Sequence, residues 1–452
     1  MSNTLIAERP AGGPPRPYVF PAVDRTRLPG GEVVAAHLPG QRMAYAGVLL
    51  EAGMFREPAG REGVGKITSD LLREGTELKS GDDFALALES LGASWSASLD
   101  TDVLRVGVQA PVDRITAALE LMTEALRRPR LAAADFERVR SDRIAKLTTA
   151  WAMPGTRASE ALMRGLYLPE SRHSKQDTGS VASVSALTLD DVRAFHAEHL
   201  SVGGTLLLAG DLAGLDIAAL GRILLAESAP EPKPAAPTAP RELTEREIVV
   251  VDRPGSVQSV LAIAHHGPRR DTEDFTAIEA MGTILGGTFN SRLNHQLREV
   301  KGYTYGARGG FELERESGIF SASASVHTEV TAEAAVDALA EIERIKREGV
   351  TEEELASTKA YRTGSLPIAL QTPGAIGGAL AQIVEFGLPD DYFTRKYAEY
   401  TKLSKDEVDA AAARRLFPEY AVVVIEGDAE KILPGLSDAG IGTVRVDAEG
   451  EA

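Results

Sequence analysis

The sequence predicts an α+β protein with two homologous domains, each an antiparallel β-sheet with helices packed on one face. Three observations support this prediction. The length of 452 residues exceeds what one ordinary hydrophobic core serves. A proline-rich stretch divides the chain into nearly equal halves, and both halves show the same order of apolar strands and periodic helices. The apolar fraction of 43% and the charged fraction of 25% are those of a globular protein.

The boundary between the halves is the clearest feature of the chain. Residues 229–240 hold five prolines, which can continue neither a helix nor a central strand, so they predict an extended linker. The sequence therefore predicts an N-terminal domain over residues 1–228 and a C-terminal domain over residues 241–452.

The repeat is read from segments that occur in the same order in each half. An apolar strand is followed by turn residues and a helical stretch that ends in Gly-Thr, then by alternating strand residues, a periodic helix and a closing strand that ends in Gly-Asp. The helix stripes are Ile115, Leu119, Met122 and Leu126 in the first half and Ala335, Leu339, Ile342 and Ile345 in the second. The predicted strands cover residues 46–52, 93–110 and 205–211, and residues 257–264, 304–326 and 421–428. Because strands and helices do not alternate regularly, antiparallel sheets are favoured over parallel ones.

Composition excludes several classes of function. The chain has no cysteine, so it forms neither disulfides nor thiolate metal sites. The net charge of −17 argues against nucleic-acid binding, which depends on Lys and Arg, and is compatible with basic peptides or a basic partner subunit. The sequence shows neither a signal peptide nor an apolar run long enough to span a membrane, which predicts a cytoplasmic protein without membrane contact.

A helix predicted at residues 64–73 carries an unusual polar face. Val64, Ile67 and Leu71 form its buried stripe, which leaves positions 66, 69 and 70 on a neighbouring face. A His-x-x-Glu-His motif uses this spacing to aim two imidazoles at one zinc ion. Here the positions hold Lys66, Ser69 and Asp70, and an ammonium group offers no lone pair to a metal. Lys66 and Asp70 are instead predicted to form an i, i+4 ion pair.

Two longer segments resemble the pitrilysin/insulinase family of zinc peptidases. Residues 53–58 and 63–76 are similar to the zinc-helix region of that family. Residues 285–306, which contain the run Ser-Arg-Leu-Asn-His-Gln-Leu-Arg, are similar to its second homologous domain. The resemblance extends over roughly residues 25–430.

The resemblance implies a zinc site that this chain has lost. In the family the first-half helix holds two zinc histidines and a catalytic glutamate, and a later glutamate completes the metal site. Lys66, Ser69 and Asp70 replace the first three, and no glutamate lies between Glu137 and Glu160, where the last ligand would fall. We therefore expect no metal and no cofactor on this chain.

The resemblance also implies a second element, an Arg/Tyr pair that lies opposite the zinc and holds the peptide and its polarised carbonyl. Arg298 and Tyr305, seven residues apart, match this pair. From the residues alone, Leu293, Leu297 and Val300 predict the buried stripe of a helix that ends at Gly302. Arg298 then projects from the last turn, and Tyr305 lies in the next strand.

Other candidate sites have weaker support. His196 and His199 have a spacing one residue shorter than the zinc-peptidase motif, and a surface helix is the favoured interpretation. His265 and His266 adjoin at a strand end, so they point to opposite faces. Gly286 and Gly287 lack the other residues of a phosphate-binding loop and are read as a turn.

Some members of the family divide the work between two half-length chains, one with zinc and one with the Arg/Tyr pair. The leading prediction is therefore the non-zinc subunit of a heterodimeric zinc endopeptidase, with peptide substrate and a zinc-bearing homologous partner. In that pair Arg298 and Tyr305 complete the partner's active site. Two alternatives stay open: a structural subunit that resembles the core proteins of respiratory complexes, and an enzyme with a relocated metal site around His196 and His199.

Overall fold

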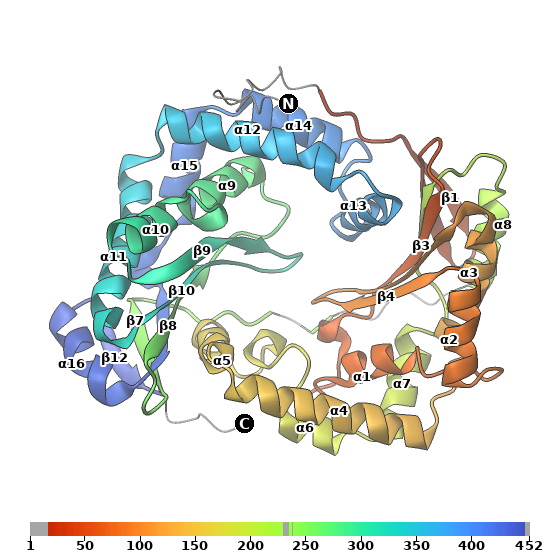
Figure 1. Cartoon of the computed structure of the whole chain (residues 1–452), viewed down its shortest axis with the longest axis horizontal. Coiled ribbons are helices and arrows are strands. Elements are labelled where there is room, and N and C mark those ends of the chain that lie inside the picture. Colours follow the sequence, from red (N-terminus) through yellow and green to blue (C-terminus); the bar gives the residue numbers. More distant parts are fainter. Residues whose placement is uncertain (1–16, 229–234, 237, 448–452) are drawn as a thin grey trace, which may run out of the picture.

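Two six-stranded β-sheets form the framework of the computed structural model, which describes residues 17–228, 235–236 and 238–447. Figure 1 shows the two sheets on opposite sides of the molecule. The first sheet has the order β1 (Val23–Leu28), β2 (Gly31–His37), β6 (Thr205–Gly210), β3 (Met43–Leu50), β5 (Leu104–Pro111) and β4 (Ser94–Leu99). The second has the order β12 (Thr443–Val446), β7 (Glu247–Asp252), β11 (Val422–Gly427), β8 (Gln258–His266), β10 (Gly318–His327) and β9 (Thr304–Leu313).

Five strands of each sheet are paired in the same way, which confirms the predicted duplication. In both sheets the closing strand lies between the first two strands of the repeat, β6 between β2 and β3 and β11 between β7 and β8. A strand inserted between two neighbours that run in opposite directions must be parallel to one of them. The pairs β2–β6 and β7–β11 are accordingly parallel, so the sheets are mixed and the prediction of purely antiparallel sheets is corrected on this point. The sixth strands differ, since β1 is antiparallel to β2 whereas β12 is parallel to β7.

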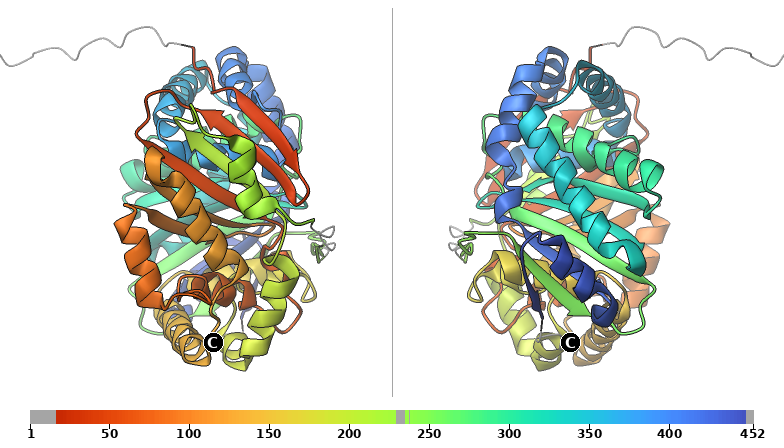
Figure 2. Two further views of the ribbon diagram at one scale, coloured as in Figure 1. Left: turned by 90° about the vertical axis from the view of Figure 1, so that its right-hand side faces the viewer. Right: turned by 90° about the vertical axis from the view of Figure 1, so that its left-hand side faces the viewer.

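Helices of each half cover one face of its own sheet, as predicted. Figure 2 shows α3 and α8 in front of the first sheet, and α11 and α16 in front of the second. The first half contributes α1 (Val64–Leu71), α2 (Gly81–Ser90), α3 (Ile115–Arg127), α4 (Ala133–Ala152), α5 (Thr156–Leu166), α6 (Val181–Ala186), α7 (Leu189–His199) and α8 (Ile217–Leu225). The second contributes α9 (Phe275–Gly282), α10 (Arg292–Asn294), α11 (Thr331–Glu348), α12 (Glu352–Ala369), α13 (Pro373–Glu385), α14 (Tyr392–Lys402), α15 (Lys405–Arg415) and α16 (Ala429–Ala439), with π-helical turns η4 (Thr283–Gly287) and η5 (His295–Val300).

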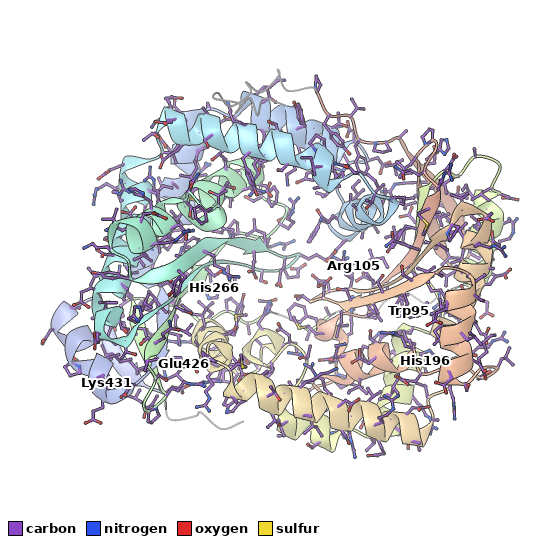
Figure 3. All side chains as sticks on the ribbon, in the orientation of Figure 1. Trp95, Arg105, His196, His266, Glu426 and Lys431 are labelled. Atoms are coloured by element: carbon purple, nitrogen blue, oxygen red, sulfur yellow. The ribbon has the colours of Figure 1, made fainter. Side chains whose placement is uncertain are left out.

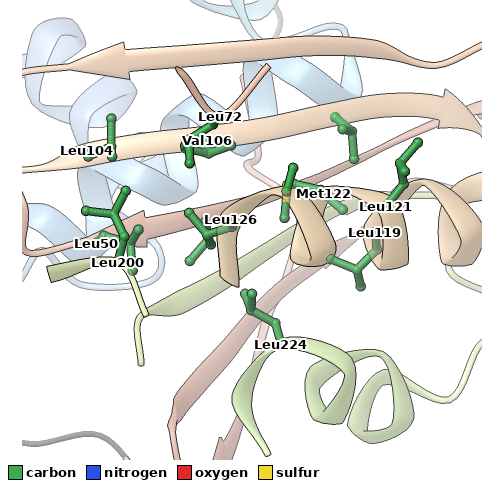
Figure 4. Packing of buried hydrophobic residues seen from close by; sticks show 14 of the residues in the cluster. Leu50, Leu72, Leu104, Val106, Leu119, Leu121, Met122, Leu126, Leu200 and Leu224 are labelled. Carbon is green, nitrogen blue, oxygen red and sulfur yellow. The ribbon is translucent and has the colours of Figure 1, made fainter. Parts of the chain in front are cut away.

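The predicted apolar stripes lie in these two cores. Figure 4 shows Leu119, Met122 and Leu126 of α3 packed against the strands of the first sheet. The four residues predicted for α11 are buried against the second sheet. Burial of a large aliphatic side chain stabilises the fold by about 1.5–3 kcal/mol, so the stripes are a principal reason why the helices lie where they do.

The second face of each sheet is covered by a helix from the other half of the chain. Ile376, Leu380 and Ile383 of α13 pack on β3 and β6 of the first sheet. In return, α5 packs on β8 and β11 of the second sheet through Leu162 and Leu166. Because both faces are covered, β6 and β11 are buried along nearly their whole length.

A buried carboxylate holds α5 on the second sheet. Glu426 of β11, labelled in Figure 3, is 1% exposed and forms an ion pair with Arg253 at 2.9 Å. Its other oxygen accepts hydrogen bonds from the backbone amides of Gly155 (2.8 Å) and Ala158 (3.3 Å) at the start of α5. The carboxylate of one half thus satisfies the free amides of a helix from the other half.

The predicted division into domains 1–228 and 241–452 stays a prediction, because residues 229–234 and 237 of the linker lie outside the described residues. Within the part of the chain that the structure describes, no helix is both long and apolar enough to cross a membrane. The cytoplasmic location also stays a prediction.

Candidate functional site

Helix α1 carries the positions at which, according to the sequence, a zinc-binding motif has been lost. Val64, Ile67 and Leu71 are buried as predicted. Lys66 and Asp70 form the predicted i, i+4 ion pair, and their side chains are 29% and 35% exposed. Ser69 is 2% exposed and is one of the buried residues of the helix. The ammonium of Lys66 therefore lies where a metal ligand would be required.

The helix α4 adds a further cation beside α1. It covers the region where the resemblance expected a last glutamate ligand, and Arg143 of α4 interacts electrostatically with Asp70. Burial lowers the pKa of Arg143, and the charge of Asp70 partly offsets this effect. Among the described residues, no three His, Cys, Asp or Glu side chains lie close enough to hold a metal ion. The residues at the zinc positions of the family do not fit a zinc ion.

The segment η5 carries Arg298 on the second half of the molecule. Gly302 has φ +66°, and its amide bonds to the carbonyl of Arg298 at 3.1 Å, so the helical segment ends where the sequence predicted. Leu293 and Leu297 are buried as predicted, but Val300 is 57% exposed. The prediction for Val300 is wrong because the π-helical turn His295–Val300 changes the rotation per residue.

Arg298 is held over an exposed aromatic ring. Its guanidinium carbon lies 4.0 Å from the ring centroid of Phe289, which is itself 66% exposed. Its Nε lies 3.5 Å from the carboxylate of Glu299. The cation–π contact fixes the direction of the side chain and leaves 29% of it exposed.

Tyr305 is turned outward by a β-bulge at the start of β9. Thr304 pairs with Val326 and Ala307 with Ala324, so two residues of β9, Tyr305 and Gly306, oppose a single residue of β10. The hydroxyl of Thr304 accepts from the Gly306 amide at 3.1 Å and donates to the Gly306 carbonyl at 2.9 Å, which stabilises the bulge. Tyr305 is consequently 91% exposed.

Asn294 fastens the bulged strand to α10. Its Oδ1 accepts from the Ala307 amide at 2.9 Å, and its Nδ2 donates to the Ala307 carbonyl at 2.6 Å. Nδ2 also donates to the Thr288 carbonyl at 3.1 Å, and the residue is 6% exposed. Asn294 thus determines where β9 begins relative to Arg298. Asn294 was not among the predicted site residues, although a polar residue directly after the buried Leu293 was a signal for it.

The structure does not bring the two elements of the site together. Figure 1 shows α1 at the lower right, under the first sheet, and α10 and β9 at the left, in the other half. Arg298 and Tyr305 therefore share one region, and Lys66, Ser69 and Asp70 share another.

The histidine candidates are engaged in other contacts. His196, labelled in Figure 3, is 8% exposed and its Nε2 donates to the Leu126 carbonyl at 2.8 Å, so this nitrogen is not available to a metal. His265 accepts from the Phe417 amide through Nε2 (3.1 Å), which assigns the proton to Nδ1. Burial lowers the pKa of His265 to about 4, so its ring is neutral. The relocated metal site around His196 and His199 therefore finds no support.

The comparison with protein families identifies the group to which the molecule is related. Residues 32–173 match the model of the insulinase family, peptidase family M16, and residues 186–361 match the model of the peptidase M16 inactive domain. The chain belongs to the insulinase family. The resemblance inferred from the sequence is thereby confirmed.

Individual members of the insulinase family are similar over almost the whole chain. A Mycobacterium tuberculosis protein named an uncharacterized zinc protease is 24% identical over 92% of this chain and 96% of its own length. A Helicobacter pylori protein named a non-peptidase homolog is 20% identical over 81% of this chain and 85% of its own length.

Solved structures show the same insulinase-family fold. The peptidase M16 inactive domain of Pseudomonas fluorescens superposes with a TM-score of 0.81 at 25% identity, over 90% of this chain and 97% of that chain. A chain of complex III from Candida albicans superposes with a TM-score of 0.76 at 17% identity, over 92% of this chain and 99% of that chain. The fold is thus shared by proteins with different described roles.

Proposed function

We propose that this chain is the non-zinc subunit of a heterodimeric zinc endopeptidase, and that Arg298 and Tyr305 act in the active site of a zinc-bearing partner. One observation carries the proposal. The zinc face of α1 has become an ion pair of Lys66 and Asp70. A bulge stabilised by side-chain contacts exposes 91% of Tyr305, and a cation–π contact with Phe289 orients Arg298. A residual scaffold without function has no need of an exposed, positioned tyrosine on a sheet edge.

The chemistry of the pair suits stabilisation of an oxyanion. A guanidinium is always charged and donates through a planar fork, and a phenol adds one further donor. A single donor of this kind lowers the barrier of an acyl-transfer step by roughly 2–4 kcal/mol when it faces the developing charge. The partner's zinc would polarise the peptide carbonyl and activate the attacking water. In this division of work Arg298 and Tyr305 hold the carbonyl oxygen and the peptide.

The substrate in this proposal is an unfolded peptide. Both β4 and β9 are edge strands, so each offers unpaired backbone groups to an extended chain. Tyr305 lies at the start of one of these edges, where a peptide added to the sheet would pass its side chain.

The test is reconstitution with a zinc-bearing insulinase-family subunit that co-purifies with this chain. We expect the isolated chain to be inactive and zinc-free, and the pair to cleave a fluorogenic peptide. Arg298→Ala should lower kcat/KM of the pair by about 50-fold or more, and Tyr305→Phe by about tenfold. Arg347→Ala, which removes an exposed arginine of α11 paired with Glu348, is the matched control and should leave kcat/KM unchanged. Activity within about twofold of wild type for Arg298→Ala contradicts the proposal.

The second candidate function is a catalytically silent structural subunit. It is favoured by the fold shared with a chain of complex III and by the similarity to a protein named a non-peptidase homolog. The two candidates differ in one outcome. A structural subunit leaves peptidase activity unchanged on mixing with the zinc-bearing partner, although the two chains still co-elute in gel filtration.

A further inference from the structure

A cavity of about 800 Å³ lies between the two halves, away from Arg298 and Tyr305. Its walls are α4, α5 and the residues around His173 from the first half, and the ends of β9 and β10 from the second. Tyr305 and Glu312 are seven residues apart on β9, which corresponds to about 23 Å along a strand. This volume is within the range of small-ligand sites.

One wall carries positive charge without full compensation. Arg143 and Lys146 are three residues apart on α4 and line the cavity. Arg143 Nε is buried and has no hydrogen-bond partner among the described residues. Within the same residues Lys146 forms no salt bridge. The helix therefore presents two cations toward the cavity.

The opposite wall carries negative charge. Glu312 lines the cavity from β9 and has no basic partner in the described part of the chain. Burial raises its pKa, and the neighbouring charges of Glu314 and Asp177 raise it further. Glu314 differs from Glu312 because hydrogen bonds from Thr101 (2.7 Å), Ser317 (2.5 Å) and His173 (2.9 Å) satisfy it.

Between the walls, His173 presents a buried ring nitrogen without a hydrogen-bond partner in the described part of the chain. It is 4% exposed, stacks on Tyr167 with 4.3 Å between ring centroids, and contacts the edge of Phe55 at 4.5 Å. Its Nε2 lies 2.9 Å from a carboxylate oxygen of Glu314, which can only accept, so Nε2 donates. The other ring nitrogen, Nδ1, has no hydrogen-bond partner among the described residues. A buried polar atom without a partner is costly, so a polar group of a ligand at this place would be stabilising.

We propose that this cavity binds the C-terminal end of a short peptide with a basic side chain. Its carboxylate faces Arg143 and Lys146, its basic side chain faces Glu312, and a polar backbone group forms a hydrogen bond with His173 Nδ1. The two opposite charges separate ligand classes. A nucleotide or other polyanion is repelled by Glu312 and Glu314, and a polyamine is repelled by Arg143 and Lys146. A ligand with both signs of charge relieves both walls. The site belongs to this chain alone and does not depend on the role of Arg298 and Tyr305.

Calorimetric titration of the full chain with three tetrapeptides tests the proposal. The probes are Ala-Lys-Ala-Ala with a free carboxylate, its C-terminal amide, and Ala-norleucine-Ala-Ala with a free carboxylate. We expect saturable binding of the first, about tenfold weaker binding of the amide, and about fivefold weaker binding of the norleucine peptide. The titration uses this chain without a zinc-bearing partner, which separates its result from that of the peptidase assay.

Variants assign each charge to its wall. The double variant Arg143→Gln with Lys146→Gln should abolish the difference between acid and amide, and Glu312→Gln should abolish the preference for lysine over norleucine. Arg395→Gln, at an exposed pair on α14, is the control and should change neither ratio. Equal binding of acid and amide within about twofold, or no binding of the first peptide at millimolar concentration, overturns the proposal.

Discussion

The two edge strands β4 and β9 begin alike and then diverge. Each follows a glycine in the left-handed region, Gly92 at φ +61° and Gly302 at φ +66°, and each has an aromatic residue at its second position. In β4 this residue is Trp95, which pairs in register with Val108 and contacts the ring of Phe84 edge-on at 5.8 Å. In β9 the bulge turns Tyr305 into solvent.

The difference shows that one inserted residue decides whether an aromatic side chain packs within its own half or faces solvent. Without the extra residue, the alternation of a strand returns the aromatic ring to its own half, as with Trp95. With it, Tyr305 becomes available to another chain. The covering helices differ in a related way, because α5 is held on the second sheet by Glu426, whereas α13 rests on the first sheet mainly by apolar packing.

The largest loss of stability should follow removal of the Glu426 carboxylate, which holds α5 on the second sheet and has no counterpart under α13 among the described residues. Glu426→Ala leaves the amides of Gly155 and Ala158 without an acceptor. It also removes the ion-pair partner of Arg253, whose guanidinium keeps only its hydrogen bond to the Ala152 carbonyl. We expect a loss of about 4 kcal/mol in the free energy of unfolding, measured by urea denaturation. Glu430→Ala, at an exposed position of α16, should cost less than about 0.5 kcal/mol. Equal stability of the two variants would show that packing alone holds α5.

The next largest effect on stability should follow loss of the clamp formed by the Asn294 hydrogen bonds to Ala307, which hold the bulged edge strand β9. Asn294→Ala leaves the Ala307 amide and carbonyl unpaired and should lower the free energy of unfolding by about 3 kcal/mol. In the reconstituted pair it should also lower kcat more than KM, because Tyr305 loses its position. The control is His295→Ala, the exposed neighbour on η5. If Asn294→Ala lowered stability but left kcat unchanged at low temperature, Asn294 would stabilise the fold without positioning Tyr305.

Glu385, at the C-terminal end of α13, should make the stability of the protein depend on pH. Burial raises the pKa of Glu385 to about 7. The folded protein then binds this proton more tightly than the unfolded chain does, so stability should fall as pH rises from about 4.5 to about 7 and then level off. We expect this fall to be roughly 1 kcal/mol, since solvent screens the partly exposed group. Thermal unfolding of Glu385→Gln between pH 5 and 8 should lack this component, and an unchanged pH profile contradicts the assignment.

The smallest effect is expected on the former zinc face. Lys66→Ala removes a half-exposed i, i+4 pair and should change the free energy of unfolding by less than about 0.5 kcal/mol. Lys66→Met is a control that keeps the length of the side chain. A loss above about 2 kcal/mol in urea denaturation would mean that the pair replaces the structural role of a metal.

Local patterns predicted the features that short stretches of chain determine. The stripe of α1, the ion pair of Lys66 with Asp70 and the helix end at Gly302 all follow from residues within one or two turns. The bulge could not be predicted, because it depends on the count of residues in β10 opposite β9. The position of Val300 was missed because a π-helical turn interrupts the 3.6-residue period.

Long-range features lay outside such patterns. The clamp formed by Asn294 joins residues thirteen positions apart, and its hydrogen bonds to Ala307 appear only when β9 lies against α10. The sequence did not show that α5 and α13 each pack on the sheet of the other half. An apolar stripe shows that a helix is buried but not against which sheet. The parallel pairs in both sheets could not be predicted either, because they depend on where the closing strands insert.

The exchange of helices has a consequence for how the chain is made. A ribosome releases β6 and completes the first sheet long before it reaches α13, whose residues 373–385 cover the outer face of that sheet. At ordinary rates of synthesis the delay is roughly 10–30 s. During this interval Leu49, Leu207 and Ala209 lack the residues of α13 that bury them in the folded protein. We therefore expect the nascent first half to bind chaperones until α13 has been synthesised.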